Sequence, residues 1–485
     1  MQPTDRAGSK SFVPPAFSHT QATLDKHRVA VLPFVNMSPD PQDEFFADGL
    51  TEELIDRLCQ VRELEVIART SVMSYKKKEK KAAEIGKELR AGALVEGSVR
   101  KAGNKIRVTA QLIDANTEGH LWSSRYDRNL EDIFAVQTDI AEQVADALKV
   151  QLLPNEKKAI EKKPTTSRDA HLLYLKGRYH WNERSPKSLK VAAEYFQKAI
   201  SEDPSFALAY VGLADSYLVL IDEGVIKPID AAQKIRSWAE KALELDASLA
   251  EAHATLGAIL MFTFWDWRRA ELEFKRSIEL NPAYPSARQW YGMYLSFTEK
   301  LDEALEQLSK ALELDPFSLI INLNYAMGLV EAGKYQKGIE QMMKTLTIAE
   351  SGFVWGHYVL GQLYIHGSEL EKAVVEFKNA LEITPGFPVV LAALGHAYGL
   401  MGRKEDAAKI LSELKETSSA SYISPALIAT VEFGLGEKEE AFRHFDEAYD
   451  ERSDMLLYGK TMPGFEDVRA DGRFTQLLTR MGFEN

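Results

Sequence analysis

The sequence predicts an α/β domain near the N-terminus followed by an all-α superhelix of repeated helix pairs. Residues 28–150 alternate short apolar runs with amphipathic stretches, which is typical of strands and helices in turn. Beyond residue 170 the eight residues SKALELDP (309–316) recur in variant form, and such recurrence is the signature of a repeat architecture. The length of 485 residues also exceeds what one hydrophobic core usually supports. The variants are QKAISEDP (197–204), EKALELDA (240–247), KRSIELNP (275–282) and KNALEITP (378–385).

Residues 1–27 are predicted to form a disordered tail. They are rich in proline, serine and threonine and contain no apolar stretch long enough for a signal-peptide core. The chain also contains no run of about eighteen apolar residues, the length that a membrane-spanning helix needs. We therefore expect a cytoplasmic protein without a membrane span, and a periplasmic one only if an export signal is missing from this start.

The predicted elements of residues 28–150 follow one another in a clear order. VAVLPF (29–34) and LEVIARTS (64–71) are strands on either side of an amphipathic helix, DEFFADGLTEELIDRL, and a second helix spans 82–90. In NKIRVTAQLIDA apolar and polar side chains alternate, which indicates a strand with one solvated face. GALVEGSVRKAG and GHLWSSRYDR flank it across short turns, and an amphipathic helix over 130–150 follows. The domain is therefore α/β with an antiparallel hairpin portion.

Three stretches of this domain resemble the TolB-like N-terminal domain of bacterial multidomain proteins: VAVLPFVNMSPDPQDEFFADGLTEELIDRL, VIARTS and GALVEGSVRKAGNKIRVTAQLIDANTEGHLWSSRYDR. In that family the domain commonly lies between an N-terminal effector and a C-terminal repeat array. The effector is a nucleotide cyclase, a Ser/Thr kinase or a winged-helix DNA-binding domain. Since 27 residues cannot hold any of these, the resemblance implies the regulatory half without a catalytic half.

The recurring phrase has the spacing of the tetratricopeptide repeat (TPR). The phrase ends at residues 204, 247, 282, 316 and 385, and most of these steps are close to 34 residues or twice that number. A TPR unit is a pair of antiparallel helices that stacks on its neighbours into a right-handed superhelix. We expect a linker over 151–169, about eight units over 170–452, and a closing cap over 453–485.

The slot pattern inside each unit tests this interpretation. Small residues let the two helices of a unit approach closely, large apolar residues fill the space between units, and proline ends the second helix. Residues 285–318 match every tested slot, whereas the second unit carries about nine extra residues around 224–230. The matching residues of 285–318 are Gly292, Leu295, Ala304, Leu308, Ala311 and Pro316.

The first helix of each TPR unit lines the concave surface, so its slots predict a partner-binding groove. The predicted groove is apolar, with methionines that can repack around different partners. We expect it to take an apolar extended segment or an amphipathic helix. The alternative is that part of this chain, such as the proline-rich tail or the α/β domain, covers it. The candidate groove residues are Gln289, Met293, Leu323, Met327, Trp355, Tyr358, Gln362 and His396.

Motifs for catalysis, cofactors or metals are missing or incomplete. GALVEGS (92–98) has the glycine spacing of a phosphate-binding loop, but Ser98 occupies the place of the essential lysine. The one cysteine, Cys59, excludes thiolate zinc sets, and His357 and His366 are too far apart to share a metal on one helix face. We therefore expect no enzyme, no cofactor and no metal site.

The net charge of −13 disfavours nonspecific binding to nucleic acid. The one dense basic run, KKKEKK (76–81), is short and lacks aromatic neighbours, so a solvated loop is favoured. Trp265 and Trp267 could stack a ligand, but filling the gap between paired helices is the simpler interpretation. Nucleic acid is therefore not expected as a partner, and homo-oligomerisation stays open.

These observations favour a non-catalytic interaction or sensor protein that grips a protein or peptide partner. Stacked repeats suit this function because they present a long, shallow surface rather than a deep reaction pocket. The alternative is a regulatory subunit that acts in trans on a nucleotide cyclase, a Ser/Thr kinase or a transcription factor.

Overall fold

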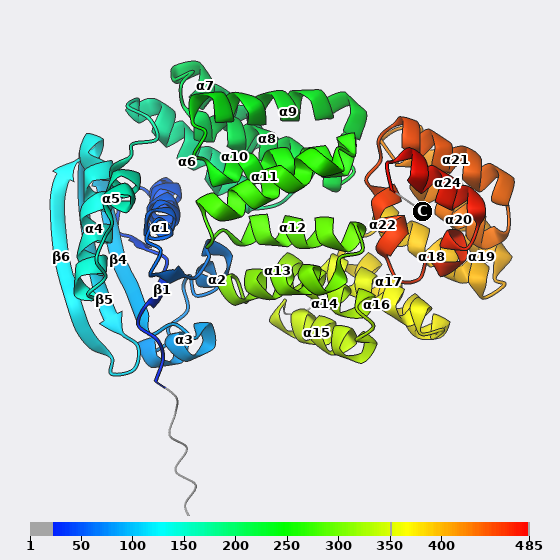
Figure 1. Ribbon diagram of the computed structural model, residues 1–485, viewed down its shortest axis with the longest axis horizontal. Coiled ribbons are helices and arrows are strands. Elements are labelled where there is room, and N and C mark those ends of the chain that lie inside the picture. The colour runs from blue at the N-terminus through cyan, green and yellow to red at the C-terminus, as the bar shows by residue number, and fades with distance from the viewer. Residues whose placement is uncertain (1–22, 350–351, 484–485) are drawn as a thin grey trace, which may run out of the picture.

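The computed structural model describes residues 23–349 and 352–483, and it consists of a sheet domain joined to an array of paired helices (Figure 1). Most of the predicted tail lies outside the described residues. Its last part, 23–27, is held against the sheet domain, because Lys26 Nζ lies 2.8 Å from Asp114 Oδ2.

The sheet domain has a mixed sheet in the order β3-β1-β4-β5-β6, with β2 also paired to β4. The β1–β3, β1–β4 and β2–β4 pairs are parallel, and β4, β5 and β6 form an antiparallel meander. This confirms an α/β domain with an antiparallel portion. The strands are β1 (Arg28–Val31), β2 (Val35–Asn36), β3 (Glu65–Val66), β4 (Ala93–Ala102), β5 (Lys105–Asp114) and β6 (Gly119–Asn129). The helices are η1 (Pro41–Asp43), α1 (Glu44–Leu58), α2 (Arg69–Met73), α3 (Ala82–Leu89), η2 (Leu130–Asp132), α4 (Ile133–Ala147) and α5 (Pro154–Glu161).

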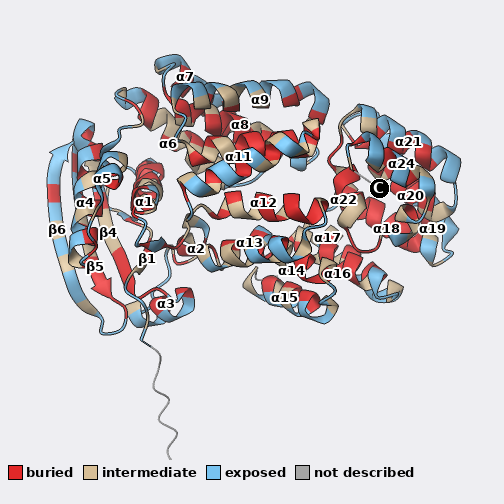
Figure 2. Cartoon of the chain, viewed as in Figure 1, coloured by how far each residue is buried: buried red, intermediate tan, exposed pale blue. Residues whose placement is uncertain are grey.

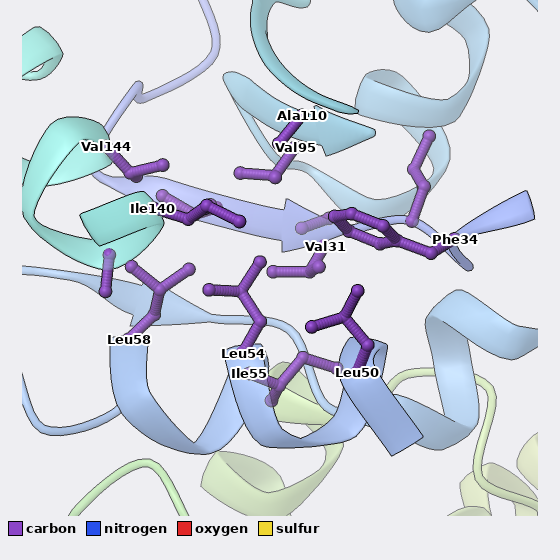
Figure 3. Packing of buried hydrophobic residues seen from close by; sticks show 14 of the residues in the cluster. Val31, Phe34, Leu50, Leu54, Ile55, Leu58, Val95, Ala110, Ile140 and Val144 are labelled. Atoms are coloured by element: carbon purple, nitrogen blue, oxygen red, sulfur yellow. The ribbon is translucent and has the colours of Figure 1, made fainter. Parts of the chain in front are cut away.

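Helices α1 and α4 cover one face of the sheet and form the domain's core (Figure 3). Leu50, Leu54 and Leu58 follow one another at four-residue spacing on α1, so they share one face and point to the sheet. On β5 the buried residues Ile106 and Val108 alternate with exposed ones, as the sequence predicts. Figure 2 shows that β6, at the sheet edge, is largely exposed.

Helix α5 lies inside the stretch that the sequence analysis interprets as a linker. It packs on the sheet domain through Ile160, which is fully buried, and through Glu156, whose Oε1 accepts a hydrogen bond from the Arg62 N–H at 3.1 Å. The sheet domain therefore extends to residue 161, and the true connection is short.

Sixteen helices of the described residues, α6 to α21, form eight consecutive pairs, which confirms the helical-repeat array. The first four pairs are α6 (Arg168–Asn182) and α7 (Pro186–Glu202), α8 (Ala207–Asp222) and α9 (Pro228–Leu245), α10 (Ala250–Ile259) with η3 (Leu260–Phe264) and α11 (Trp267–Leu280), and α12 (Pro285–Phe297) and α13 (Leu301–Leu314). The other four are α14 (Leu319–Glu331) and α15 (Tyr335–Ile348), α16 (Val354–His366) and α17 (Leu370–Ile383), α18 (Pro388–Leu400) and α19 (Lys404–Ser418), and α20 (Pro425–Leu435) and α21 (Lys438–Asp450). Three short helices, α22 (Met455–Thr461), α23 (Glu466–Arg469) and α24 (Gly472–Arg480), end the described chain.

The small residues of the slot pattern lie where a large side chain of the second helix meets the first helix. Phe196 on α7 is fully buried between Gly177 on α6 and Gly212 on α8. A Cβ at either glycine would lie 2.6 Å from the phenyl ring, so any larger residue would push the helices apart.

The aspartate near the end of the recurring phrase anchors the sheet domain and its connection to the array. In three repeats this carboxylate accepts a hydrogen bond or forms an ion pair with a residue outside the array. The Phe317 N–H donates to Ser71 Oγ at 2.9 Å and extends one of these contacts. The pairs are Thr165 Oγ1 to Asp203 (2.5 Å), Lys162 Nζ to Asp246 (2.5 Å) and Ser71 Oγ to Asp315 (2.5 Å).

The main face between the sheet domain and the array is formed by α1 and α6. Gly49 on α1 allows close packing, because a Cβ there would lie 2.7 Å from Leu175 Cδ2. Beside it, Glu52 Oε1 accepts a hydrogen bond from Arg178 Nε at 2.7 Å, and Glu52 Oε2 forms an ion pair with Arg69 Nε at 3.0 Å. Both arginines are largely buried, so this carboxylate compensates two charges at the interface.

Candidate partner-binding groove

The predicted groove residues lie on the first helices of successive pairs, from α12 to α18. Met327, Tyr358, Gln362 and His396 are buried, and the other four are partly buried. Residues 454–469, here called the groove segment, pack against the same helices, and the following helix α24 packs against α21. In Figure 1 helix α22, the first part of this segment, lies at the end of α12.

The first half of the groove segment forms part of the wall of an apolar pocket beside α12 and α14. Met462 is 5% exposed and packs in the cluster that contains Met327, while Tyr458 meets the Phe297 ring edge-on at 6.1 Å between centroids. Residues that line this pocket are Met293, Ser296, Phe297, Leu308, Leu323, Asn324, Met327, Gly328, Glu331, Tyr458, Thr461 and Met462.

The second half of the segment is held by two histidines of the array. His366 Nδ1, at the end of α16, lies 2.7 Å from Glu466 Oε1. His396 Nε2, on α18, lies 3.1 Å from Asp467 Oδ2, and its ring stacks on Phe465 with centroids 5.7 Å apart. The segment therefore presents acids at one end and apolar groups in the middle.

Two buried carboxyl groups along this contact, those of Glu331 and Asp454, have pKa values raised far above the ordinary value of a carboxyl group. Burial raises the pKa of Glu331 to about 7, although Ser296, Thr461, Lys460 and Arg469 act in the opposite direction. Burial and the neighbouring charge of Asp222 raise the pKa of Asp454 to about 8. Each group favours its protonated form, because an ionised carboxylate loses hydration there.

Asp467 behaves differently from these two acids. Burial opposes its ionisation, but the hydrogen bond and charge of His396 outweigh burial and lower its pKa. The Lys460 ammonium, which is 11% exposed, pairs with Glu299 Oε1 at 2.5 Å just beyond α12. A basic group therefore faces the α12 side of the groove and an acidic group faces α18.

The sequence analysis named candidate groove residues, but it did not name several residues that form pairs with the groove segment or with its neighbours. Glu331, His366 and Lys460 were missed because charged residues near helix ends are ordinarily solvated. The remaining candidates differ in their contacts. Trp355 packs against Tyr358 and Phe387, at 5.7 and 5.2 Å between ring centroids, and Gln289 is partly buried on α12.

The two tryptophans of FTFWDWRRA contact the C-terminal helices, which the sequence interpretation did not foresee. The Trp265 ring lies 5.0 Å from that of Tyr449 on α21, and Trp267 Nε1 donates to the Met481 carbonyl at 2.8 Å. Trp265 therefore joins the third helix pair to the last one, and Trp267 joins it to the end of α24, so neither ring only fills space between neighbouring helices.

The other sequence candidates have structural partners. GALVEGS lies at the start of β4 and before it, and in the basic run Lys76 pairs with Asp48 at 2.5 Å. His357 pairs with Glu376 at 2.7 Å, away from His366. Within residues 23–349 and 352–483, no group of three or more histidine, cysteine or acidic side chains could hold a metal. None of the described helices has the length and apolar composition needed to cross a membrane.

Two family models match separate parts of the chain. The HilA/YgeH-like transcriptional regulator, second domain, matches residues 25–143, and a tetratricopeptide repeat matches residues 285–318. The chain contains TPR repeats and a HilA-like N-terminal domain. The TolB-like identity of that domain is not confirmed.

Relatives match only parts of the chain. The protein named "Putative adenylate cyclase 3" of Rhizobium meliloti (strain 1021) is 37% identical over 236 residues, which are 48% of this chain and 40% of that protein. Transcriptional regulator HilA of Salmonella typhimurium is 30% identical over 148 residues, 30% of this chain and 27% of HilA. The chain thus spans less than half the length of these relatives. Among solved structures, the TPR protein YrrB is 24% identical to this chain. The match covers 41% of this chain and 98% of the YrrB chain, with a TM-score of 0.29.

Proposed function

We propose that this chain is a non-catalytic regulator of a bacterial signalling system, located in the cytoplasm, whose TPR groove binds a segment of a partner protein. One observation supports this most strongly: the predicted groove residues contact two short helices of the same chain, α22 and α23, and the residues between them, with an apolar pocket at one end and paired charges at the other. The function needs neither a cofactor nor a metal. The sheet domain, which we propose to be of the TolB N-terminal kind, supplies a second contact surface.

The physical chemistry of the groove favours a polypeptide over a small substrate. Its residues come from four successive helix pairs. They can therefore contact successive side chains of a polypeptide, whereas a small substrate would need a pocket that encloses it. Methionines at 293 and 327 adapt to different apolar side chains because their unbranched thioethers have many conformations.

A second candidate is regulation in trans of a nucleotide cyclase, a kinase or a transcription factor. The names of the two relatives favour it, since one is named as a cyclase and the other as a transcriptional regulator. Mixing the purified chain with the full-length Rhizobium meliloti relative, and measuring cyclic AMP formation, tests the cyclase form. A severalfold change in rate supports this candidate, and an unchanged rate at saturating chain counts against it.

The main proposal is tested by affinity capture with the full chain as bait and mass spectrometry as readout. Met293→Glu with Met327→Glu places two charges in the apolar pocket, so we expect at least tenfold less of each specific partner. Leu272→Glu with Met343→Glu is the matched control, because these side chains are 61% and 55% exposed on the second helices α11 and α15. Equal capture by the two variants, both folded by circular dichroism, would refute the groove assignment.

A further inference from the structure

Several side chains of the groove segment each contact their own place in the groove, and each such place is here called a seat. The order of these side chains along the segment defines a sequence pattern. The apolar seat holds Met462, the histidines hold Glu466 and Asp467, and Phe465 stacks on one of them. Met462 lies against α14, Gly464 and Glu466 lie against α16, and Phe465 and Asp467 lie against α18. The segment therefore has a fixed direction and register in the groove.

Between these seats the groove accepts only a glycine. Gly464 has a φ of +90°, and a Cβ there would lie 2.7 Å from Gln362 Oε1 and 3.2 Å from the Gln362 carbonyl oxygen. An L-residue at this position would be strained by its backbone and would also collide with α16. Pro463 precedes this glycine and stiffens the approach to it.

The chain's own segment leaves hydrogen-bonding groups of the groove wall unused. Gln362 Oε1 and His396 Nδ1 are buried, yet within the described residues neither has a hydrogen-bond partner. The N–H of Gly464, a residue that lies against Gln362, donates to Glu466 Oε2 of its own segment at 2.9 Å. Buried acceptors ordinarily have donors, so the wall is built for more hydrogen bonds than this occupant supplies.

We propose that the groove binds, in trans, a segment of another protein with the pattern apolar–Pro–Gly–aromatic–acid–acid, and that the groove segment competes for the same seats. The proposal rests on the proposed function and names the chemistry of the partner. The apolar side chain enters the Met462 seat, the aromatic ring stacks on His396, and the two acids pair with His366 and His396. An extended partner whose glycine N–H donates to Gln362 satisfies the acceptor that the groove segment leaves free.

The covalent attachment of the groove segment to the array determines whether this segment or a partner peptide occupies the groove. A covalently attached segment acts at an effective concentration of the order of millimolar, so a partner peptide binds the intact chain more weakly than a chain whose segment is displaced. Gly464→Val displaces it by strain and collision. Gly472→Val is the matched control, because a Cβ at Gly472 meets no atom within 4 Å.

The experiment measures fluorescence anisotropy of a labelled peptide, YGKTMPGFEDVRA (residues 458–470), with the full-length chain. We expect saturable binding to Gly464→Val that is at least tenfold tighter than to the native chain or to Gly472→Val. Replacing the peptide's phenylalanine by alanine, or its Glu-Asp pair by Gln-Asn, should weaken binding at least tenfold, and a scrambled peptide should not bind.

Three outcomes overturn the proposal: no binding to a folded Gly464→Val chain, equal binding of the scrambled peptide, or dimerisation of Gly464→Val without peptide binding, which assigns the groove to a second copy. If Gly464→Val does not fold, Phe465→Ala takes its place under the same criteria, since it removes only the ring that stacks on His396. A chain that captures partners through its groove but ignores this peptide retains the proposed function and rejects the pattern.

Discussion

Replacing Glu331 by glutamine should stabilise the protein at pH 8 and have little effect at pH 5. The carboxyl group lies at the end of α14 against the groove segment, where Ser296 and Thr461 are its neighbours. Its Oε2 is buried without a hydrogen-bond partner among the described residues. An ionised carboxylate at this place therefore has too few hydrogen bonds to replace its lost hydration, although Ser296 and Thr461 donate to it.

The size and sign follow from the raised pKa of Glu331. The difference between the ordinary value of 4.5 and about 7 corresponds to ~3 kcal/mol between the two protonation states, at about 1.4 kcal/mol per pH unit. Since the folded pKa is raised, the contribution of this group to stability is fully present below pH 4.5 and is lost as the pH rises through about 7. Glutamine stays neutral throughout, so the advantage of the variant grows between pH 5 and pH 8.

Thermal unfolding at both pH values, followed by circular dichroism, measures this difference. We expect the Tm of Glu331→Gln minus that of the native chain to increase by ~3 °C or more from pH 5 to pH 8, since 1 kcal/mol shifts Tm by a few degrees in domains of this kind. Glu405→Gln, an exposed acid on α19, is the control and should show no such change. A Glu331→Gln variant that is less stable than the native chain at pH 8 would refute the reasoning.

Three further predictions concern the packing of the array and its contact with the sheet domain. Phe196→Ala leaves a cavity and should cost ~3–5 kcal/mol in urea unfolding, whereas Leu272→Ala at an exposed site should cost less than ~1 kcal/mol; similar costs would contradict the repeat packing. Ser71→Ala removes a donor to Asp315 and should weaken the interface by ~1–3 kcal/mol, seen as faster proteolytic separation of sheet domain and array; an unchanged rate would contradict this. Glu52→Gln leaves two buried arginines without their carboxylate and should cost ~3–5 kcal/mol in unfolding free energy; a cost below ~1 kcal/mol would mean that water compensates them.

The sequence predicts the elements of this fold well where local periodicity determines them. Alternation on β5 and four-residue spacing on α1 each follow from one buried face, so the pattern and the structure agree. The helix pairs are equally predictable, because Phe196 and the glycines that it meets must recur wherever two helices pack closely. Helix α5 was missed because its eight residues offer only one fully buried apolar side chain, Ile160.

The TPR slots place the candidate groove residues on the first helices of the pairs, but they do not indicate which part of the chain packs against them. TPR slots identify side chains such as Met327 and Tyr358, since the slot number fixes the helix face. The sequence analysis considered the proline-rich tail and the α/β domain as covers, and among the described residues the segment that lies there is 454–469. The apolar clusters after Ser453 show that this stretch must be buried, but periodicity cannot say against which surface, because that contact joins residues about 100 positions apart, as between His366 and Glu466.

Departures from the repeat pattern mark contacts between distant helix pairs, which the regular slots do not indicate. The extra residues of the second pair contain Lys227, whose Nζ lies 2.7 Å from Glu451 Oε1 at the end of α21. In the third pair the helix widens into the π-helical η3 and places Trp265 against Tyr449. In an open array the second and third pairs would contact only their neighbours, so neither irregularity would make these contacts with the last pair. Both irregularities contact the last pair, Lys227 through Glu451 and Trp265 through Tyr449, so the second and third pairs pack against the last pair. These contacts bring the two ends of the array together beside the groove segment.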